Sequence, residues 1–295
     1  MRQKKSSRDN KTTSALTPDL SFVKSARVIT ATHSEVDLLM VGCGGTGSHM
    51  AGAVARLMRA IKEGGKNVSA LFIDPDFVEE KNIGRQNFCD AEVGYPKAQT
   101  LAARYSLALG LDIKAITSPF STDMCDMRMK WNTLTVMVGC VDNAAARQEI
   151  ARTLQKKGGK TPPHLWWLDC GNNRASGQAL VGSTNDPQAL KQAFVFGSRC
   201  QHLPSPAWQC PNLLEPQPEE VDNHKLSCAE LALANAQGLN VNQRVAVEAA
   251  DLLTRLLLTQ DLRRFATYFD LNSGGVKNHY ITEENINAFV APTTT

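Results

Sequence analysis

Hydrophobic positions between residues 36 and 168 follow two periods in turn. Short apolar runs that stop at glycine or at polar residues are typical of buried strands, and apolar residues three and four apart are typical of helices. This pattern predicts strands at 36–41, 68–73, 113–118, 134–138 and 165–168, and helices at 46–61, 96–109 and 143–155. Strands and helices that alternate at this spacing predict an α/β fold, a doubly wound and mostly parallel sheet with helices on both faces.

The pattern changes in the second half of the chain. Residues 178–183 favour one more strand, whereas residues 197–228 contain five of the thirteen prolines and show no clear period. A segment this long without periodicity is typical of a functional or disordered loop, and we expect a long crossover loop there. Residues 241–258 predict a strongly amphipathic helix, and residues 265–281 predict two C-terminal antiparallel strands joined by an Asn-Ser-Gly-Gly turn.

Composition limits the functional classes. The net charge is only +3, and no apolar stretch approaches the roughly 18 residues of a membrane span, so neither a membrane nor a nucleic-acid partner is expected. The eight cysteines are scattered and follow no secretory signal, which favours reduced thiols in the cytoplasm. Residues 1–20 form a basic tail that we expect to be disordered, with a nucleic-acid arm as the alternative.

A glycine loop, Gly42-Cys43-Gly44-Gly45-Thr46-Gly47, lies between the first predicted strand and helix. In this context Gly42 permits a tight turn, Gly44 lets the backbone approach a ligand, and Gly47 allows close packing of helix and strand. The amino end of the helix then favours a phosphate. The loop fits NAD, FAD, S-adenosylmethionine or ATP equally well, and a purely structural turn is the alternative.

Acidic and basic residues follow the second predicted strand. Asp74 and Asp76 end this strand, where a carboxylate binds ribose hydroxyls, although Asp-Pro-Asp is also ordinary turn chemistry. Asn82, Arg85, Gln86 and Lys97 come next. A dinucleotide reader has no evident need for this Arg and Lys, whereas transfer at an α-phosphate needs cations to offset the charge on the leaving pyrophosphate. Surface positions for both cations are the alternative.

Asp142 and Asn143 end the fourth predicted strand. Carboxyl ends of parallel strands meet at the ligand crevice, so the Asp142 carboxylate is suited to hold Mg²⁺ beside the phosphates. The alternative is that Asp142 caps the helix that follows.

These motifs, in this order, resemble the ThiF/MoeB/HesA family and the adenylation domains of ubiquitin-activating enzymes. The resemblance rests on the glycine loop, on Asp74-x-Asp76, and on the runs Asn82-Ile83-Gly84-Arg85-Gln86, Val93-Gly94-x-Pro96-Lys97 and Val141-Asp142-Asn143-x-x-x-Arg147. A closer similarity is to the ThiF-family branch found in bacterial PRTRC genetic systems. It rests on local sequence such as Ser227-Cys228-Ala229-Glu230 and Tyr268-Phe269-Asp270-Leu271-Asn272.

The resemblance implies a single Rossmann-like adenylation domain at 21–295, with a nucleotide-binding half at 36–175 and a half at 176–295 that binds a ubiquitin-like protein. It implies Mg-ATP as cofactor and adenylation of the C-terminal glycine carboxylate of a β-grasp, ubiquitin-like partner. Gly42, Gly44, Gly45, Gly47, Asp74, Asp76, Asn82, Arg85, Gln86, Lys97, Asp142 and Asn143 would bind the nucleotide, and Asp142 the metal. The family usually forms homodimers in which an Arg reaches the partner's site, and Arg2, Arg8 and Arg27 are candidates here.

The sequence departs from the family pattern in its cysteines and in the loop that carries Arg85. Gly84 stands where the family usually has Asn. The two Cys-x-x-Cys pairs that hold structural zinc in many bacterial members are missing, so zinc is not expected. The irregular alternative for a metal is the set Cys200, His202, Cys210, His224 and Cys228.

Cys228 precedes the long predicted helix, where a family cysteine can accept the activated carboxylate before an E2-like carrier or a sulfur-carrier acceptor. A helix amino end lowers a thiol pKa and so favours such a nucleophile, whereas a half-buried structural cysteine is the alternative. Cys200 and Cys210 are weaker candidates. Two other functions remain open for the chain: a non-catalytic nucleotide-binding scaffold, and an NAD- or FAD-dependent oxidoreductase.

Overall fold

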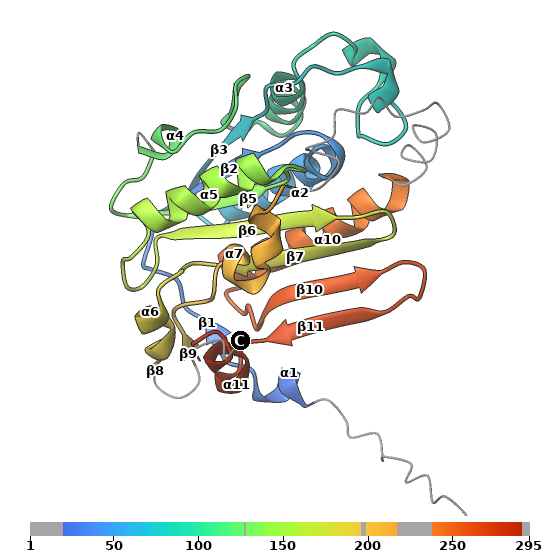
Figure 1. Cartoon of the computed structure of the whole chain (residues 1–295). Coiled ribbons are helices and arrows are strands. Elements are labelled where there is room, and N and C mark those ends of the chain that lie inside the picture. Colours follow the sequence, from blue (N-terminus) through green and yellow to red (C-terminus); the bar gives the residue numbers. More distant parts are fainter. Residues whose placement is uncertain (1–19, 127, 196–198, 217–237, 291–295) are drawn as a thin grey trace, which may run out of the picture.

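The computed structural model describes residues 20–126, 128–195, 199–216 and 238–290. Its main sheet has eight strands in the order β11-β10-β7-β6-β5-β2-β3-β4 (Figure 1). Their bounds are β2 Glu35–Val41, β3 Asn67–Ile73, β4 Ile113–Ile116, β5 Thr133–Gly139, β6 Leu165–Asn172, β7 Ser176–Gly182, β10 Arg264–Asp270 and β11 Val276–Tyr280. The strands from β4 to β6 pair in parallel, and β7, β10 and β11 pair antiparallel. The predicted α/β fold is therefore confirmed.

Helices cover both faces of this sheet, as the alternating pattern predicts. In Figure 1, α5 and α7 lie on the near face, and α2 and α10 lie on the far face. The bounds of the longer helices are α2 Gly45–Glu63, α3 Lys97–Leu109, α5 Ala144–Lys157 and α10 Gly238–Leu257. Because helices cover the central strand β2 on both sides, six of its seven residues are buried, which explains its nearly continuous apolar sequence.

Two hydrophobic clusters correspond to the two faces. The larger cluster includes Met50 of α2, Leu101 of α3 and Leu252 of α10, together with strand residues such as Leu38. The smaller cluster packs Ile150 of α5 against Leu39 and Trp167. Neighbouring residues of one strand, Leu38 and Leu39, thus belong to different clusters, because successive side chains of a strand point to opposite faces.

Several short elements have no counterpart in the sequence prediction. A separate three-stranded sheet pairs β1 with β9 and β9 with β8. The bounds of the short elements are α1 Ser21–Lys24, β1 Arg27–Val28, η1 Glu80–Asn82, η2 Asp90–Glu92, α4 Asp123–Asp126, α6 Pro187–Lys191, β8 Phe194–Val195, β9 Arg199–Cys200, α7 Pro206–Gln209, η3 Pro211–Leu214 and α11 Glu283–Asn287. Strands of two residues and helices of four or five are too short to show a period.

None of the helices in the described ranges is long and apolar enough to cross a membrane. The tail at residues 1–19 and most of the second half of the expected crossover loop lie outside the described residues. The division into halves at 36–175 and 176–295 stays a proposal. In the sheet the two halves share one hydrogen-bonded ladder, since β7 pairs with β6.

Candidate active site

The carboxyl ends of the parallel strands meet at one edge of the sheet. β2 runs into the glycine loop there, β3 ends before Asp74, and β5 ends before Asp142. The register places Val41, Ile73 and Gly139 side by side at this edge. The sequence candidates from these three strand ends therefore lie in one region of the molecule, as expected for a doubly wound sheet.

Packing requires three of the four glycines in the loop. Gly42 has a φ of +92°, and a Cβ there would lie 2.6 Å from the Cys140 carbonyl oxygen. A Cβ at Gly47 would lie 2.1 Å from the Gly42 carbonyl oxygen, and one at Gly45 would lie 2.8 Å from Nδ2 of Asn242. At Gly44 the nearest atom is 3.9 Å away, so the protein leaves space beside this residue. That space suits the close approach of a ligand to the backbone.

Asp74 fixes the start of the glycine loop. Its Oδ2 accepts a hydrogen bond from the Cys43 amide at 2.5 Å, and its Oδ1 accepts one from the Asp76 amide at 2.8 Å. Burial raises the pKa of the Asp74 carboxyl, although these two amides and Lys97 oppose the rise. The carboxylate thus positions two backbone segments of the site, in addition to any contact with a ribose.

The loop between β3 and α3 carries the predicted cations. Lys97, the first residue of α3, is buried and donates to Oδ2 of Asp76 at 2.9 Å. The Asp76 side chain is 64% exposed, so this ion pair opens to solvent at its acidic end. Asn82 is buried, and its Oδ1 accepts from the Glu79 amide at 2.9 Å. In this structure the Asn82 side chain therefore holds the loop together.

Arg85 and Gln86 contain buried polar atoms that have no hydrogen-bond partner among the described residues. These atoms are Nε of Arg85, a donor, and Oε1 of Gln86, an acceptor. Such atoms are uncommon because a buried polar group without a partner costs about 1–3 kcal/mol. Gln86 is also the residue nearest to the free space at Gly44. These residues suit a ligand that brings acceptors for Arg85 and a hydroxyl or amine donor for Gln86, as ATP does.

Asn242, near the start of α10, connects these segments. Its Oδ1 accepts from Oγ1 of Thr46 at 3.1 Å and from Nδ2 of Asn172 at 2.7 Å. Its Nδ2 donates to the main-chain oxygen of Arg85 at 3.4 Å. One buried amide thereby joins the glycine loop, the end of β6 and the Arg85 loop. Asn242 belongs to none of the motifs recognised in the sequence.

Asp142 is exposed at the same edge, and among the described residues it accepts a hydrogen bond from Nδ2 of Asn143 at 3.4 Å. The cap of α5 is Asn143, whose Oδ1 accepts from the Ala146 amide at 2.9 Å. The alternative role of Asp142 as a helix cap is therefore wrong. The assignment of Asn143 to nucleotide binding stays a prediction, with this capping role beside it.

A buried ion pair supports the backbone next to Asp142. Nε of Arg147 donates to Oδ1 of Asp169 at 3.2 Å, and Nη2 of Arg147 donates to the carbonyl oxygen of Val141 at 2.6 Å. Asp169 is completely buried, and its second oxygen has no partner within the described ranges. Burial raises the pKa of Asp169, and Arg147 opposes the rise. The pair fixes the peptide that carries Asp142.

Burial makes Cys43, Cys200 and Cys210 poor nucleophiles. Burial raises the pKa of Cys200 to about 12, and burial also raises the pKa values of Cys43 and Cys210. Cys228 and His224 lie outside the described residues. The thioester at Cys228 and the alternative zinc site of five residues therefore stay predictions. Within the described ranges, no three His, Cys, Asp or Glu side chains group closely enough to hold a metal ion.

Sequence comparison identifies the family of this fold and site. The model of the ThiF family matches residues 24–265, which is most of the chain. The chain belongs to the ThiF family. No curated protein sequence matches this ThiF-family chain. The finer likeness to the PRTRC branch stays a prediction.

Solved structures with the same fold include PaaA, with a TM-score of 0.52 and 13% identity over 83% of this chain and 64% of PaaA. E. coli MccB with MccA-N7isoASN has a TM-score of 0.51 and 15% identity, over 89% of this chain and 67% of MccB. E. coli MccB with AMPCPP and MccA has a TM-score of 0.50 and 15% identity, over 89% and 66%. The ThiF-family chain thus spans about two thirds of the length of these proteins.

The arrangement of this ThiF-family site combines three features: space beside Gly44, an Arg85 donor without a partner, and an exposed carboxylate at Asp142. Asn242 and Asp169 are the positioning residues that the sequence analysis did not find. A signal for Asn242 exists, because this polar residue shares one helical face with Val245 and Ala249. No comparable signal marks Asp169, which follows a run of apolar residues.

Proposed function

We propose that this chain uses ATP to adenylate the C-terminal carboxylate of a polypeptide. The observation that carries this proposal is the unpartnered Nε of Arg85, held beside the glycine loop by the bond between Asn242 and the Arg85 main chain. A guanidinium donor at this place suits phosphate oxygens, for which it has the right charge and fork geometry. Membership of the ThiF family and the fold shared with MccB support the same activity.

In the proposed reaction, a carboxylate oxygen of the partner attacks the α-phosphorus of ATP. A P–O bond forms as the bond from the α-phosphorus to the bridging oxygen breaks, and pyrophosphate leaves with that electron pair. The product is an acyl adenylate. Arg85 and Lys97 offset the charge that develops on the phosphates, and the backbone of the glycine loop with the amino end of α2 binds phosphate oxygens.

The remaining predicted residues have supporting roles in this proposal. Asp74 or Asp76 binds the ribose, with Asn82 and Gln86 beside the nucleotide. A magnesium ion, bound by Asp142 and by phosphate oxygens, would neutralise charge on the phosphates. Magnesium is commonly held by one or two carboxylates together with substrate phosphates, so a lone exposed Asp142 fits this role.

We further propose a ubiquitin-like β-grasp protein ending in glycine as the partner, in the cytoplasm, with the enzyme acting as a homodimer. Support comes from the ordered family motifs and from MccB, whose structure with AMPCPP also contains MccA. Cys228 is the proposed acceptor for a thioester, from which an E2-like or sulfur-carrier protein takes the acyl group. Of the three candidates for the Arg that enters the partner's site, Arg27 lies on β1 and lines a cavity of its own chain, and Arg2 and Arg8 lie outside the described residues.

The test is ATP–pyrophosphate exchange with the full chain and a ubiquitin-like protein ending in Gly-Gly. We expect exchange with this partner and none with the same partner lacking its last glycine. Nucleotide binding without exchange for any polypeptide carboxylate would favour the non-catalytic scaffold, and binding of NAD or FAD instead of ATP would favour an oxidoreductase. A reductant-sensitive gel shift that persists in Cys228→Ala would exclude Cys228 as the acceptor.

A further inference from the structure

A cavity of about 390 Å³ lies between β1, β9 and the carboxyl-terminal end of α10. The segment that connects β1 to β2 also lines it. Its charged lining residues are Arg27, Lys66 and Arg199, and no Asp or Glu lines it. The volume falls in the range of small-ligand pockets, about 300–1,000 Å³. We propose that this cavity binds a small phosphate-bearing anion, independently of the adenylation site.

The two arginines are placed unfavourably unless an anion joins them. Arg27 of β1 and Arg199 of β9 are register partners, so two like charges stand at neighbouring positions of adjacent strands. Like charges placed this way destabilise a sheet. Neither arginine forms an ion pair within the described residues, whereas Arg104, Arg128 and Arg255 each bind a carboxylate. A phosphate between the two guanidinium groups would convert this repulsion into attraction.

Lys66 contributes a third cation, which has no counter-ion in the part of the chain that the structure describes. Its Nζ lies 2.9 Å from Nε2 of His33, and Nδ1 of His33 lies 2.7 Å from the carbonyl oxygen of Ala31. This pattern puts the ring proton on Nδ1, so that Nε2 accepts from Lys66 and the imidazole is neutral. Burial lowers the pKa of His33, which agrees with the neutral form. The charge of Lys66 is therefore available to an anion.

Backbone donors complete the set. Residues 30–33 connect β1 to β2 and line the cavity, and their four amides donate no hydrogen bond to any described residue. The nearest acidic residue in sequence to this lining is Asp261, which follows Gln260 and is bound by Nη1 of Arg255 at 3.0 Å. Cations and free amides without a free carboxylate are the donor set that binds phosphate.

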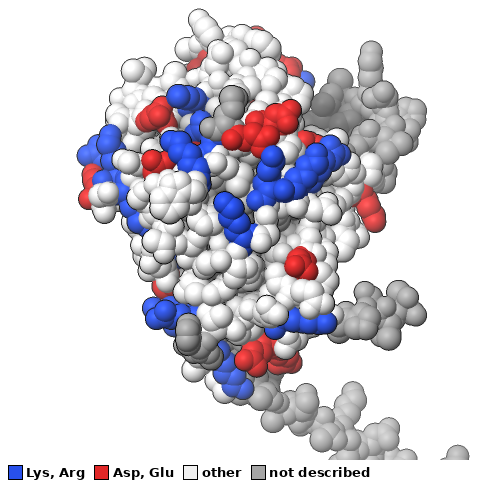
Figure 2. Space-filling model, turned by 90° about the vertical axis from the view of Figure 1, so that its left-hand side faces the viewer, with Lys and Arg blue, Asp and Glu red and all other residues white. Residues whose placement is uncertain are grey.

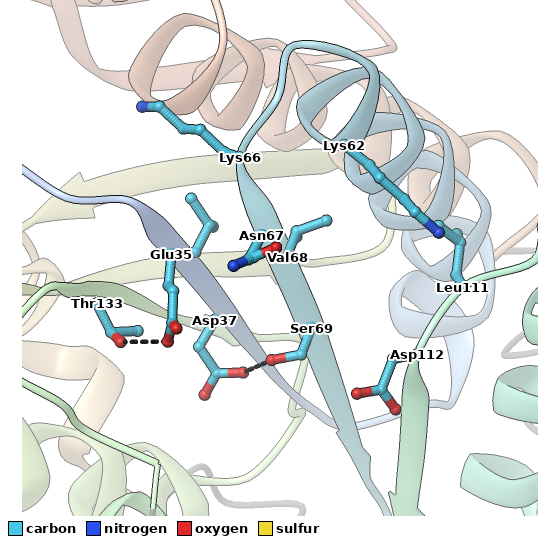
Figure 3. A pocket seen from close by; sticks show the side chains of 11 residues that line it. Glu35, Asp37, Lys62, Lys66, Asn67, Val68, Ser69, Leu111, Asp112 and Thr133 are labelled. Atoms are coloured by element: carbon cyan, nitrogen blue, oxygen red, sulfur yellow. Dashed lines mark hydrogen bonds between the residues drawn. The ribbon is translucent and has the colours of Figure 1, made fainter.

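A neighbouring cavity shows the opposite character. It is lined by Glu35, Asp37 and Asp112 as well as by lysines (Figure 3). Asp37 is bound by Nε of Arg128 at 2.7 Å. Lys66 borders both cavities, and in Figure 3 its side chain points away from Asp37 and Asp112. The head group of Lys66 thus belongs to the cationic cavity.

The occupant is a small molecule and not a nucleic-acid backbone. Figure 2 faces the side of the molecule where the parallel strands begin, and its Lys and Arg side chains are interspersed with Asp, Glu and uncharged surface. A nucleic-acid footprint is a continuous basic patch or stripe. The cations of the cavity instead line one small pocket that is open to solvent.

Isothermal titration calorimetry of the full chain with inorganic phosphate, at constant ionic strength made up with chloride, tests this site. We expect saturable binding that weakens about tenfold or more in Arg27→Gln and in Arg199→Gln, the loss typical of one charged hydrogen bond. Arg56→Gln is the matched control, because Arg56 is also exposed and without an ion pair in the described residues. It should bind phosphate as the wild type does.

Lys97→Met separates this site from the adenylation site and should leave phosphate binding intact. The proposal is overturned if phosphate binds no better than chloride, if Lys97→Met removes the binding, or if Arg56→Gln weakens it as much as Arg27→Gln. Binding of a DNA duplex that requires Arg27 and Arg199, without saturable phosphate binding, would also overturn it. Failure of the pyrophosphate-exchange assay has no bearing on these outcomes.

Discussion

Asn242 and Gly45 meet where α10 packs against the glycine loop, and a Cβ on Gly45 would lie only 2.8 Å from Nδ2 of Asn242. Glycine at this position therefore serves a contact within the protein, whereas a Cβ on the neighbouring Gly44 would have its nearest neighbour, Nε2 of Gln86, at 3.9 Å. Two adjacent glycines of one loop have different reasons to be glycine. This difference can be tested by making the same small substitution at each.

Gly45→Ala should destabilise the fold by about 1–3 kcal/mol, the usual cost of an extra methyl group in a tightly packed place. Gly44→Ala should change stability much less but should weaken ATP binding, because its Cβ fills the space left for a ligand. Urea unfolding and titration with a fluorescent ATP analogue measure the two effects. Equal losses of stability in both variants would contradict the distinction.

Asn242→Ala should partly relieve the clash in Gly45→Ala. In a double-mutant cycle, residues in contact usually show a coupling of about 0.5–3 kcal/mol, and we expect a coupling that makes the double variant more stable than the sum predicts. Additive losses would show that Ala at position 45 is accommodated without moving Asn242.

Arg85→Ala should lower the rate of pyrophosphate exchange by about 10²–10³-fold, the loss typical of one electrostatic donor to a transition state. Stability should change little, because Nε of Arg85 has no hydrogen-bond partner among the residues that the structure describes. Arg85→Lys should recover only part of the rate, since an ammonium lacks the guanidinium fork. Arg56→Ala is the control for loss of a surface charge. Unchanged exchange in Arg85→Ala would remove Arg85 from the mechanism.

The sequence predicts the parallel half of this fold well, because buried strands and amphipathic helices carry strong periods. It also places the glycine loop, Asp74 and Asp142 at one edge, since parallel strands end together. What it does not predict are contacts between distant residues. Thr46 and Asn242 are 196 positions apart, and only the packing of α10 on α2 brings them together.

Polar side chains with two suitable partners are equally hard to predict from sequence. Asp142 and Asn143 are adjacent and both cap helices well, yet the structure uses Asn143. Lys97 could face phosphate or carboxylate, and in this structure it binds Asp76. Residue type alone cannot decide between such partners, because the choice depends on the direction in which the backbone leaves each strand.

Asp142→Asn should abolish metal-dependent exchange while leaving the fold intact. Asp142 is exposed and makes only a 3.4 Å contact with Asn143, so the change in unfolding free energy should stay within about 0.5 kcal/mol. The measurement is exchange across a magnesium titration, with urea unfolding in parallel. The control is Asp123→Asn, which removes another surface carboxylate. Asp186→Asn would not serve, because Asp186 caps α6. Full activity in Asp142→Asn would exclude Asp142 as a metal ligand.

Asp169→Ala should behave in the opposite way, with a large loss of stability. It leaves a cavity and removes the acceptor that Nε of Arg147 binds, and removing one member of a buried ion pair typically costs about 3–5 kcal/mol. Arg147 also holds the Val141 carbonyl oxygen, so loosening of this side chain should weaken magnesium dependence through Asp142. Circular dichroism during urea unfolding, and exchange assays on the folded fraction, separate these effects.

The pH dependence of stability tests whether burial or the charge of Arg147 has the larger effect on the pKa of Asp169. Burial raises the folded pKa of Asp169 above the unfolded value of about 3.9, and Arg147 offsets only part of the rise. A raised folded pKa gives stability that is complete below the unfolded pKa and is lost as pH rises through the folded pKa. The stability of the wild type relative to Asp169→Asn should therefore fall as pH increases from about 4 and then level off. A relative stability that grows with pH over this range would mean that the charge of Arg147 outweighs burial, and that Asp169 is ionised more readily in the folded protein than in the unfolded chain.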